Sequence, residues 1–343
     1  MRTITFLAFL LVIFSGNAQP RKWRVNNNPS YNIAQNGVTV FNDLQQAVST
    51  VQSGDTLYVE ASAMDYGNVI VQNKAIHFVG SGYFLNENPS TQHNTLAARI
   101  RRITFDVGSS GSSVSGLELT AQGSVASIVF TNTDLSNITI RRCNLEQELD
   151  FNNNADHLIT NILVEQSFVN DIAVFVGPVT NVVLTNNFFP NLTIPEHFIA
   201  VISQNVFGNI VNIQGQPFYN NIVLGSSINQ NNNSINNIHH NLFDFAQPAW
   251  LNGGTNVFGV PQANIFADLN ASSDKKYQLK PQNECPGCYQ GTPAGQQVGM
   301  FGGSSPYRIS GVPAIPAIYN ILSPTGVAAG GQLNVTLSTR ANN

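Results

Sequence analysis

Arginine and carboxylate side chains recur in the middle of the chain at regular spacings. Glu165 follows Arg141 by 24 positions, and a second arginine, Arg142, is adjacent to the first. Another arginine pair lies 40 positions earlier. An arginine fork binds carboxylate groups through paired hydrogen bonds, so such a cluster could hold an anionic sugar. The candidate ligand-binding residues are Arg101, Arg102, Arg141, Arg142, Asp150 and Glu165.

Two adjacent histidines, His239 and His240, could serve as metal ligands or as a proton relay. Neighbouring residues of a β-strand point to opposite faces, so both rings would converge on one ion only if the chain bent there. We therefore interpret the pair as part of a repeating scaffold, with solvent-facing side chains.

The chain has three cysteines, and two of them form the sequence CPGC, at Cys285 and Cys288. A redox-active dithiol should open a helix after a strand, and a zinc site needs two more ligands. Neither pattern surrounds this pair, so the favoured interpretation is a small local disulfide or a loop without a chemical role. The third cysteine is Cys143.

The composition narrows the class of partner. Only 10% of residues are charged, against about 25% in typical domains, yet 42% are hydrophobic, so low charge here does not indicate disorder. The net charge of -4 gives no broad basic surface, and we expect neither a nucleic acid nor an anionic membrane as partner.

Residues 1–18 have the features of a secretory signal peptide: a positive charge at Arg2, a short apolar run and small residues before a cut after Ala18. The apolar run is too short to span a membrane, and no later segment is long enough. The expected location is outside the cytoplasm: secreted, at the cell surface or periplasmic. The oligomeric state is open.

A short motif recurs through the middle of the chain: two inward apolar residues, a small or amide residue, and another apolar one. Its small or amide position falls at Cys143, Ser167, Asn187, Asn205 and Asn241, with spacings of 24, 20, 18 and 36 residues. The last spacing fits two coils, with the missing copy near FYNNIVLGSS. One more coil is suggested at Asn264 to Phe266.

Each copy alternates as a half-buried strand does, and a single strand cannot bury its apolar face alone. Stacking the copies about 4.8 Å apart would bury a continuous column. An asparagine at each turn tolerates a left-handed backbone and can bond its counterpart one coil away. In this stack Glu165 lies one coil above Arg141, and a simple ion pair is favoured over a sugar site.

The two ends differ from the repeat. Apolar residues from Phe41 to Val51 lie on one face of a short helix, which would cap the first coil, and a strand follows at Thr56 to Val59. The domain boundaries are a β-solenoid over residues 19–275 and a proline- and glycine-rich tail over 276–343. The tail would lie over the open last coil, with short strands at 318–322 and 332–337.

These features together resemble the right-handed parallel β-helix superfamily, which includes the pectin-lyase-like proteins. The tail motifs around Phe301 to Gly303 and Ser310 to Pro316 resemble uncharacterised secreted bacterial members. The resemblance implies an all-β right-handed parallel β-helix with an N-terminal capping helix and a C-terminal β/Pro-rich cap.

Enzymes of that superfamily use clustered acidic residues beside an Arg or Lys. The Asn132 to Asp134 stretch resembles one polygalacturonase motif, but the other motifs of that family are absent. We assign no catalytic residue, metal ligand or cofactor; calcium would enter only with a lyase activity.

The expected function is that of a non-catalytic secreted or surface protein that presents its outer sheets and loops to a carbohydrate or other surface partner. The alternative is a divergent polysaccharide lyase or glycoside hydrolase acting on an acidic glycan. If the chain is an enzyme, we expect two or three carboxylates to meet beside an Arg or Lys in a groove. If it is a binding protein, we expect exposed aromatic residues instead, and the candidates are Tyr83, Phe84, Tyr219 and Trp250.

Overall fold

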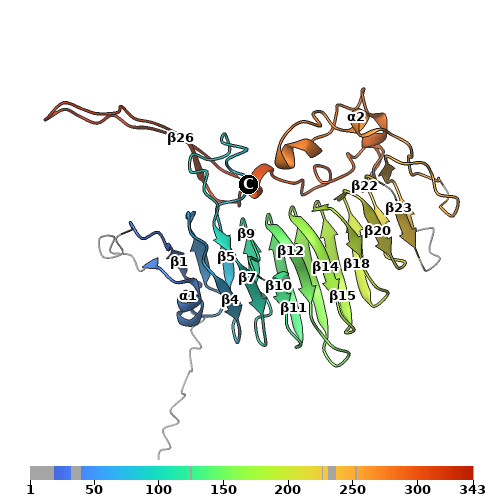
Figure 1. Cartoon of the computed structure of the whole chain (residues 1–343), viewed down its shortest axis with the longest axis horizontal. Coiled ribbons are helices and arrows are strands. Elements are labelled where there is room, and N and C mark those ends of the chain that lie inside the picture. Colours follow the sequence, from blue (N-terminus) through green and yellow to red (C-terminus); the bar gives the residue numbers. More distant parts are fainter. Residues whose placement is uncertain are drawn as a thin grey trace, which may run out of the picture.

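The computed structural model describes residues 19–31, 40–123, 126–225, 227–230, 237–251 and 253–342. The predicted signal peptide lies outside these residues. The described chain is dominated by parallel strands arranged in stacked sheets, with few and short helices (Figure 1).

The first sheet pairs its strands in parallel and almost entirely in chain order. Only the first two strands exchange places at one edge. From that edge the strands are β2 (Val40–Phe41), β1 (Lys22–Val25), β3 (Thr56–Val59), β5 (His77–Val79), β8 (Ser113–Ser115), β11 (Leu135–Arg141), β13 (Ile159–Glu165), β15 (Val179–Thr185), β18 (Phe198–Ser203), β21 (Phe218–Tyr219) and β24 (Ile238–His239).

The second sheet is also parallel and follows chain order. Its strands are β4 (Asn68–Val71), β7 (Arg102–Phe105), β10 (Ala126–Phe130), β12 (Asn144–Phe151), β14 (Phe168–Val174), β16 (Phe188–Phe189), β19 (Val206–Phe207), β22 (Ile222–Val223) and β25 (Leu242–Phe243), with β6 (Arg99–Ile100) and β9 (Glu118–Leu119) paired beside β12. A third, short sheet contains β17 (Leu192–Thr193), β20 (Ile210–Ile213) and β23 (Ser227–Gln230).

Alternation along each strand builds the core between the sheets. In β11, Ile138 and Ile140 are buried, and they align with Ile162 and Val164 of β13. Equivalent residues of each coil therefore stack into apolar columns, and one continuous core cluster runs from Val25 to Leu251. Parallel strands that recur in chain order around one core are consistent with a β-helix or solenoid.

The predicted amide ladder is confirmed. The side chain of Asn187 donates to Asn205 Oδ1 at 3.1 Å, and Asn205 donates in turn to Asn221 at 3.1 Å. Asn221 and Asn241 continue the series, at 3.2 and 3.0 Å from their acceptors. Asn221 supplies the missing copy of the motif, so the interval of 36 residues does contain two coils. The last acceptor of the series is Asn256.

Two expectations about this repeat were wrong. The left-handed backbone lies one residue before the amide, with φ of 56° at Asn186 and 59° at Gln204, because the amide itself must point inward to bond the next coil. The coil expected at Asn264 is instead part of helix α2 (Gln262–Ile265).

The helix predicted near the N-terminus is α1 (Leu44–Thr50). The Asp43 carboxylate accepts a hydrogen bond from the backbone N–H of Gln46 and so caps its first turn. Leu44, Ala47 and Val48 are buried in the core of the solenoid. The side chain of Gln45 bonds both the N–H and the carbonyl of Ile70, and so occupies part of the open edge of β4.

The tail does not follow the expected course. Residues 285–313, here called the strap, run back along one edge of the solenoid, from the last coils toward the first (Figure 1). The left-handed residues of successive coils donate to strap carbonyls: Asn220 to Thr292, Asn186 to Met300 and Gly302, Gln166 to Ser305 and Pro306, and Arg142 to Val312.

The strap also covers a second apolar cluster on the outside of the second sheet. The coils contribute Val206, Ile222 and Leu242 to this cluster. The strap and the segment before it contribute Ile265, Phe266, Cys285, Cys288, Val298, Met300 and Tyr307. Side chains expected to face solvent at the turns are therefore buried, with Gln166 and Asn186 each only 2% exposed.

Beyond the strap, β26 (Ala317–Leu322) and β27 (Thr336–Arg340) pair antiparallel and form a hairpin. The first strand was predicted nearly at its observed position, and the second lies a few residues later than expected. Figure 1 shows this hairpin extending away from the stacked strands, beyond the end of the solenoid where β1 lies.

Candidate functional site

A polar groove lies on the early coils of the second sheet. Its volume is about 530 Å³, and its charged lining comprises Asp65, Arg99, Arg101 and Glu146. A smaller neighbouring groove shares Arg99 and is also lined by Glu118. We call these five residues the Arg/Glu groove.

Register explains why these side chains share one face. Arg99 of β6 aligns with Glu118 of β9, which aligns with Asn144 of β12. Arg99 of β6 and Arg101, in the bend between β6 and β7, line the same groove, and Ile100 between them is buried. Short strands thus bring acidic and basic residues from three coils to one surface.

The guanidinium groups are held in place by the chain around them. Arg101 forms an ion pair with Asp65, with 2.9 Å between Nε and Oδ1. Arg99 donates from Nη2 to the Ala63 carbonyl at 2.5 Å. Arg101 keeps 44% of its side chain exposed, so its remaining donors face the groove and solvent.

The two glutamates have perturbed acidities. Burial raises the pKa of Glu118, and the nearby Arg99 charge only partly opposes this shift. Burial also raises the pKa of Glu146, with a further contribution from the negative charge of Glu118. A carboxyl group that raises the pKa of a second one beside an arginine is an arrangement that acid–base chemistry on a sugar could use.

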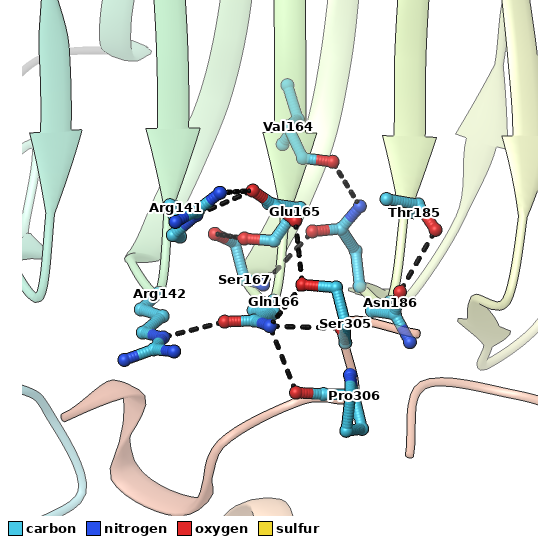
Figure 2. A network of polar contacts seen from close by, with 11 residues as sticks. Arg141, Arg142, Val164, Glu165, Gln166, Ser167, Thr185, Asn186, Ser305 and Pro306 are labelled. Atoms are coloured by element: carbon cyan, nitrogen blue, oxygen red, sulfur yellow. Dashed lines mark hydrogen bonds and ion pairs between the residues drawn. The ribbon is translucent and has the colours of Figure 1, made fainter. Parts of the chain in front are cut away.

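The residues predicted from the sequence are divided among three places. Arg141 and Glu165 lie on the outside of the first sheet, aligned across β11 and β13, and form the expected ion pair (Figure 2). Glu165 is only 4% exposed and also accepts a hydrogen bond from the Ser305 hydroxyl of the strap. This pair therefore joins two neighbouring coils to each other and to the strap.

Arg142 is directed toward the strap, away from any groove. It is 5% exposed and donates to Gln166 Oε1 at 2.6 Å and to the Val312 carbonyl at 2.9 Å (Figure 2). Burial lowers the pKa of this guanidinium, with the charges of Arg308 and Arg141 acting in the same direction.

Asp150 and Arg102 lie on the second sheet, apart from the Arg141 pair. Asp150 aligns with Val129 and Ala173, and Arg102 aligns with Asn68 of β4. The predicted patch joining Arg101 and Arg102 to Arg141 is therefore not formed, because the two arginine pairs belong to different sheets. Of the predicted residues, Arg101 alone lines the Arg/Glu groove.

The groove residues that the sequence did not reveal are Asp65, Arg99, Glu118 and Glu146. One signal was available: a single apolar residue, Ile100, separates Arg99 from Arg101, and such alternation indicates that the two arginines lie on the side opposite to it. The glutamates gave no such signal. The register of β12 shifts between Leu145 and Glu148, so Glu146 does not follow the spacing of the repeat.

The histidine pair differs from expectation in its geometry. The two Nδ1 atoms lie 2.9 Å apart, because His240 has a left-handed backbone, with φ of 56°, and its ring turns toward His239. His239 also stacks on Tyr219, with 5.2 Å between ring centroids. Burial, and then the charge of His240, lower the pKa of His239.

Cys285 and Cys288 form a disulfide, as favoured from the sequence. Cys143 is buried with a free thiol, and burial raises its pKa to about 12. Among the described residues, no group of three or more His, Cys, Asp or Glu side chains is arranged to hold a metal ion.

Most of the aromatic residues considered for ligand contact are packed against other side chains. Tyr83 is fully buried, and Phe84 packs edge-on against it. Tyr219 is stacked on a histidine, whereas Trp250 is 37% exposed. The outer surface therefore offers charged and amide groups more than aromatic platforms.

No protein family, curated protein or solved structure was found to match this chain. Within the described residues no helix is both long and apolar enough to cross a bilayer.

Proposed function

We propose that the chain is a secreted or cell-surface parallel β-helix of right-handed coil that binds a carbohydrate in the Arg/Glu groove. In this proposal α1 closes the first coil, and its burial of Leu44, Ala47 and Val48 against the core supports that role. The signal-peptide features of residues 1–18 support export.

The observation that carries the binding proposal is the convergence of two arginines with three carboxylates around two adjoining open grooves that share Arg99. Sugars present many hydroxyl groups, which donate to carboxylates and accept from guanidinium groups. An acidic sugar adds a carboxylate that an arginine fork binds through paired hydrogen bonds.

The test uses the full chain and a panel of acidic and neutral polysaccharides, with retained glycan and product size measured together. We expect retention of at least one acidic glycan without shortening. Replacing both arginines, Arg99→Ala with Arg101→Ala, should weaken that retention at least tenfold. Unchanged retention in the double variant would contradict binding in this groove.

Arg24→Ala is the matched control. Like Arg101, Arg24 is paired with one carboxylate, that of Glu60, and keeps 41% of its side chain exposed, against 44% for Arg101. It lies outside the Arg/Glu groove, so its removal should leave glycan retention unchanged. A similar loss in both variants would indicate a general effect of net charge.

The second candidate function is cleavage of an acidic glycan, and the placement of Glu118 and Glu146 in adjoining grooves that share Arg99, with the pKa of each raised by burial, favours it. A carboxyl group with a raised pKa can act as a general acid near neutral pH. Shortened products, abolished by Glu118→Gln or Glu146→Gln while retention persists, would establish an enzyme. Unsaturated product ends would identify a lyase, and the same assay with and without calcium would show whether that ion takes part.

A further inference from the structure

The hairpin formed by β26 and β27, residues 317–340, carries an unusual concentration of exposed apolar side chains. We call it the arm. Seven of the 18 large apolar residues that are exposed in the described chain lie on it, with Leu322 60% and Leu333 58% exposed. The others are Ile318, Tyr319, Val327, Val335 and Leu337.

The only charged residue of the arm is Arg340, at its base. No Asp, Glu, Lys, Arg or His occurs between Arg308 and Arg340. Natural sheet edges are usually protected by charged side chains, prolines or covering segments. Neither strand contains a proline, and the one charged side chain, Arg340, lies at the base, so beyond the base the edges of the arm carry neither a charge nor a strand proline.

The contacts that join the arm to the solenoid lie at its base. The N–H of His93 donates to the Ile318 carbonyl at 2.8 Å, and Arg340 donates to the Thr91 carbonyl at 2.7 Å. From there the arm extends into open space (Figure 1). A two-stranded hairpin is marginally stable by itself, so a surface that covers the arm would stabilise it.

A second groove lies beside the base of the arm. Its volume is about 1010 Å³, and one wall is formed by Ile315, just before the arm, and by Ile318 and Ile321 at the base of the arm. The opposite wall belongs to the first coils and includes Lys22 and Tyr58. This base groove is separate from the Arg/Glu groove and shares no residue with it.

Two arms related by a two-fold axis would cover the apolar face of each arm and fill each base groove at the same time. In such a pair the arms lie antiparallel, so the tip of each reaches the base of the other. The apolar tip, near Val327, then lies at the partner's base groove. Because the arm carries no charge beyond Arg340 at its base, two copies can pack here without the repulsion that their shared net charge of -4 would cause over a larger contact.

The area suits a reversible dimer. At about 3.3 Å per residue and about 4.8 Å between strands, a 12-residue leg gives a face of roughly 40 by 10 Å. One face therefore supplies about 400 Å² per copy, and a stable interface needs about 800 Å² per partner. The base groove must supply the remainder, so arm and groove are both required.

From these observations we infer that the arm is a self-association surface, which packs antiparallel against the arm of a second copy of this chain and places its tip in that copy's base groove.

The first test measures molecular mass by analytical ultracentrifugation over a range of protein concentrations. We expect a monomer–dimer equilibrium, shifted at least tenfold toward monomer by Leu333→Lys with Leu337→Lys. The control is Val176→Lys with Ile199→Lys, because these side chains are 74% and 58% exposed on the coils. A monomer at every concentration, or equal weakening by both pairs of substitutions, would overturn the inference.

The second test identifies the contact. One variant carries Val327→Cys at the arm tip, and another carries Lys22→Cys in the base groove. Mixing them under oxidising conditions should yield a cross-linked pair of two different chains, whereas Val176→Cys mixed with Lys22→Cys should not. A dimer that forms without the tip-to-groove cross-link would overturn the antiparallel arrangement.

Discussion

Asp150 shows how a single outward residue can reduce the stability of the fold. Its Oδ1 atom is buried and has no hydrogen-bond partner among the described residues. Burial, followed by the neighbouring charge of Glu148, raises the pKa of its carboxyl group to about 6. An aspartate in an unfolded chain has a pKa of about 3.9. Between these values the folded state binds more protons, so the free energy of unfolding falls as pH rises from about 4 to 6.

Asp150→Asn should remove that dependence. We expect the variant to be more stable than the parent at pH 7 by about 1 kcal/mol, since a shift of about two units at about 1.4 kcal/mol each is reduced by partial solvent screening. Urea unfolding at several pH values measures this difference. Asp156→Asn, at an exposed position, should leave the pH profile unchanged, and a destabilised Asp150→Asn would contradict the argument.

Removing a side chain of the buried amide ladder should have the opposite effect and lower the stability of the fold. Asn205 is fully buried, donates to the carbonyls of Leu184 and Ser203, and accepts from the N–H of Asn187. Asn205→Ala would leave these groups unpaired away from water, and should lower the free energy of unfolding by about 3 kcal/mol.

The control for the ladder is Asn212→Ala. Asn212 donates to the Thr193 hydroxyl at 3.0 Å in an exposed amide series of the third sheet. Water replaces the lost hydrogen bond there, so we expect a cost below about 0.5 kcal/mol. Equal costs at the two sites in thermal or urea unfolding would show that burial is not the deciding factor.

At the scale of elements, a buried aspartate joins three segments distant in sequence. Asp274 is fully buried and accepts hydrogen bonds from Asn88 at 2.9 Å, from the Tyr307 hydroxyl at 2.9 Å and from the N–H of Ser310. The Tyr307 hydroxyl in turn lies 2.8 Å from that of Tyr83.

Removing this carboxylate should loosen the strap. We expect Asp274→Ala to cost about 3 kcal/mol, because several buried donors lose their acceptor. Amide hydrogen exchange should accelerate in residues 300–312 and around Asn88, with little change in β13 or β15. Asp268→Ala, at an exposed position, is the control. Uniform acceleration across the coils would show instead that Asp274 stabilises the whole solenoid.

The elements that sequence predicted well are those governed by local periodicity. Inward residues such as Ile138 and Val164 recur with the coil, and so do the ladder amides, so their burial could be expected. The strap could not be predicted in the same way. Its bonds to Gln166 and Asn186 span 139 and 114 residues and use its own backbone carbonyls, which have no sequence signature.

The Arg/Glu groove escaped prediction for a related reason. Glu118 belongs to the two-residue strand β9, and Glu146 lies where the register of β12 shifts. Both residues therefore lie outside the regular repeat, and only the stacked coils bring them near Arg99. The candidate residues on the regular coils, Arg141 and Glu165, proved to be paired with each other.

At the scale of the whole molecule, the chain combines a rigid stack with two outward features, the Arg/Glu groove and the arm. They use different chemistry, charged hydrogen bonding in one and apolar contact in the other. Salt therefore separates them: raising the ionic strength should weaken retention of an acidic glycan but leave the arm-mediated dimer intact or strengthened. Retention and molecular mass measured at 0.05 and 0.5 M NaCl test both, and a parallel loss of the two would contradict separate surfaces.

The direction of the strap has a consequence for the order of events during synthesis. The ribosome releases the coils from first to last, whereas the strap, which seals their turns, emerges afterwards and is laid down in reverse. Arg142 and Gln166 are complete early, yet their strap partners near Val312 and Pro306 arrive only about 140 to 170 residues later. A nascent chain must therefore carry an open seam for up to about half of its length, and the seam closes only after the last coil has been made.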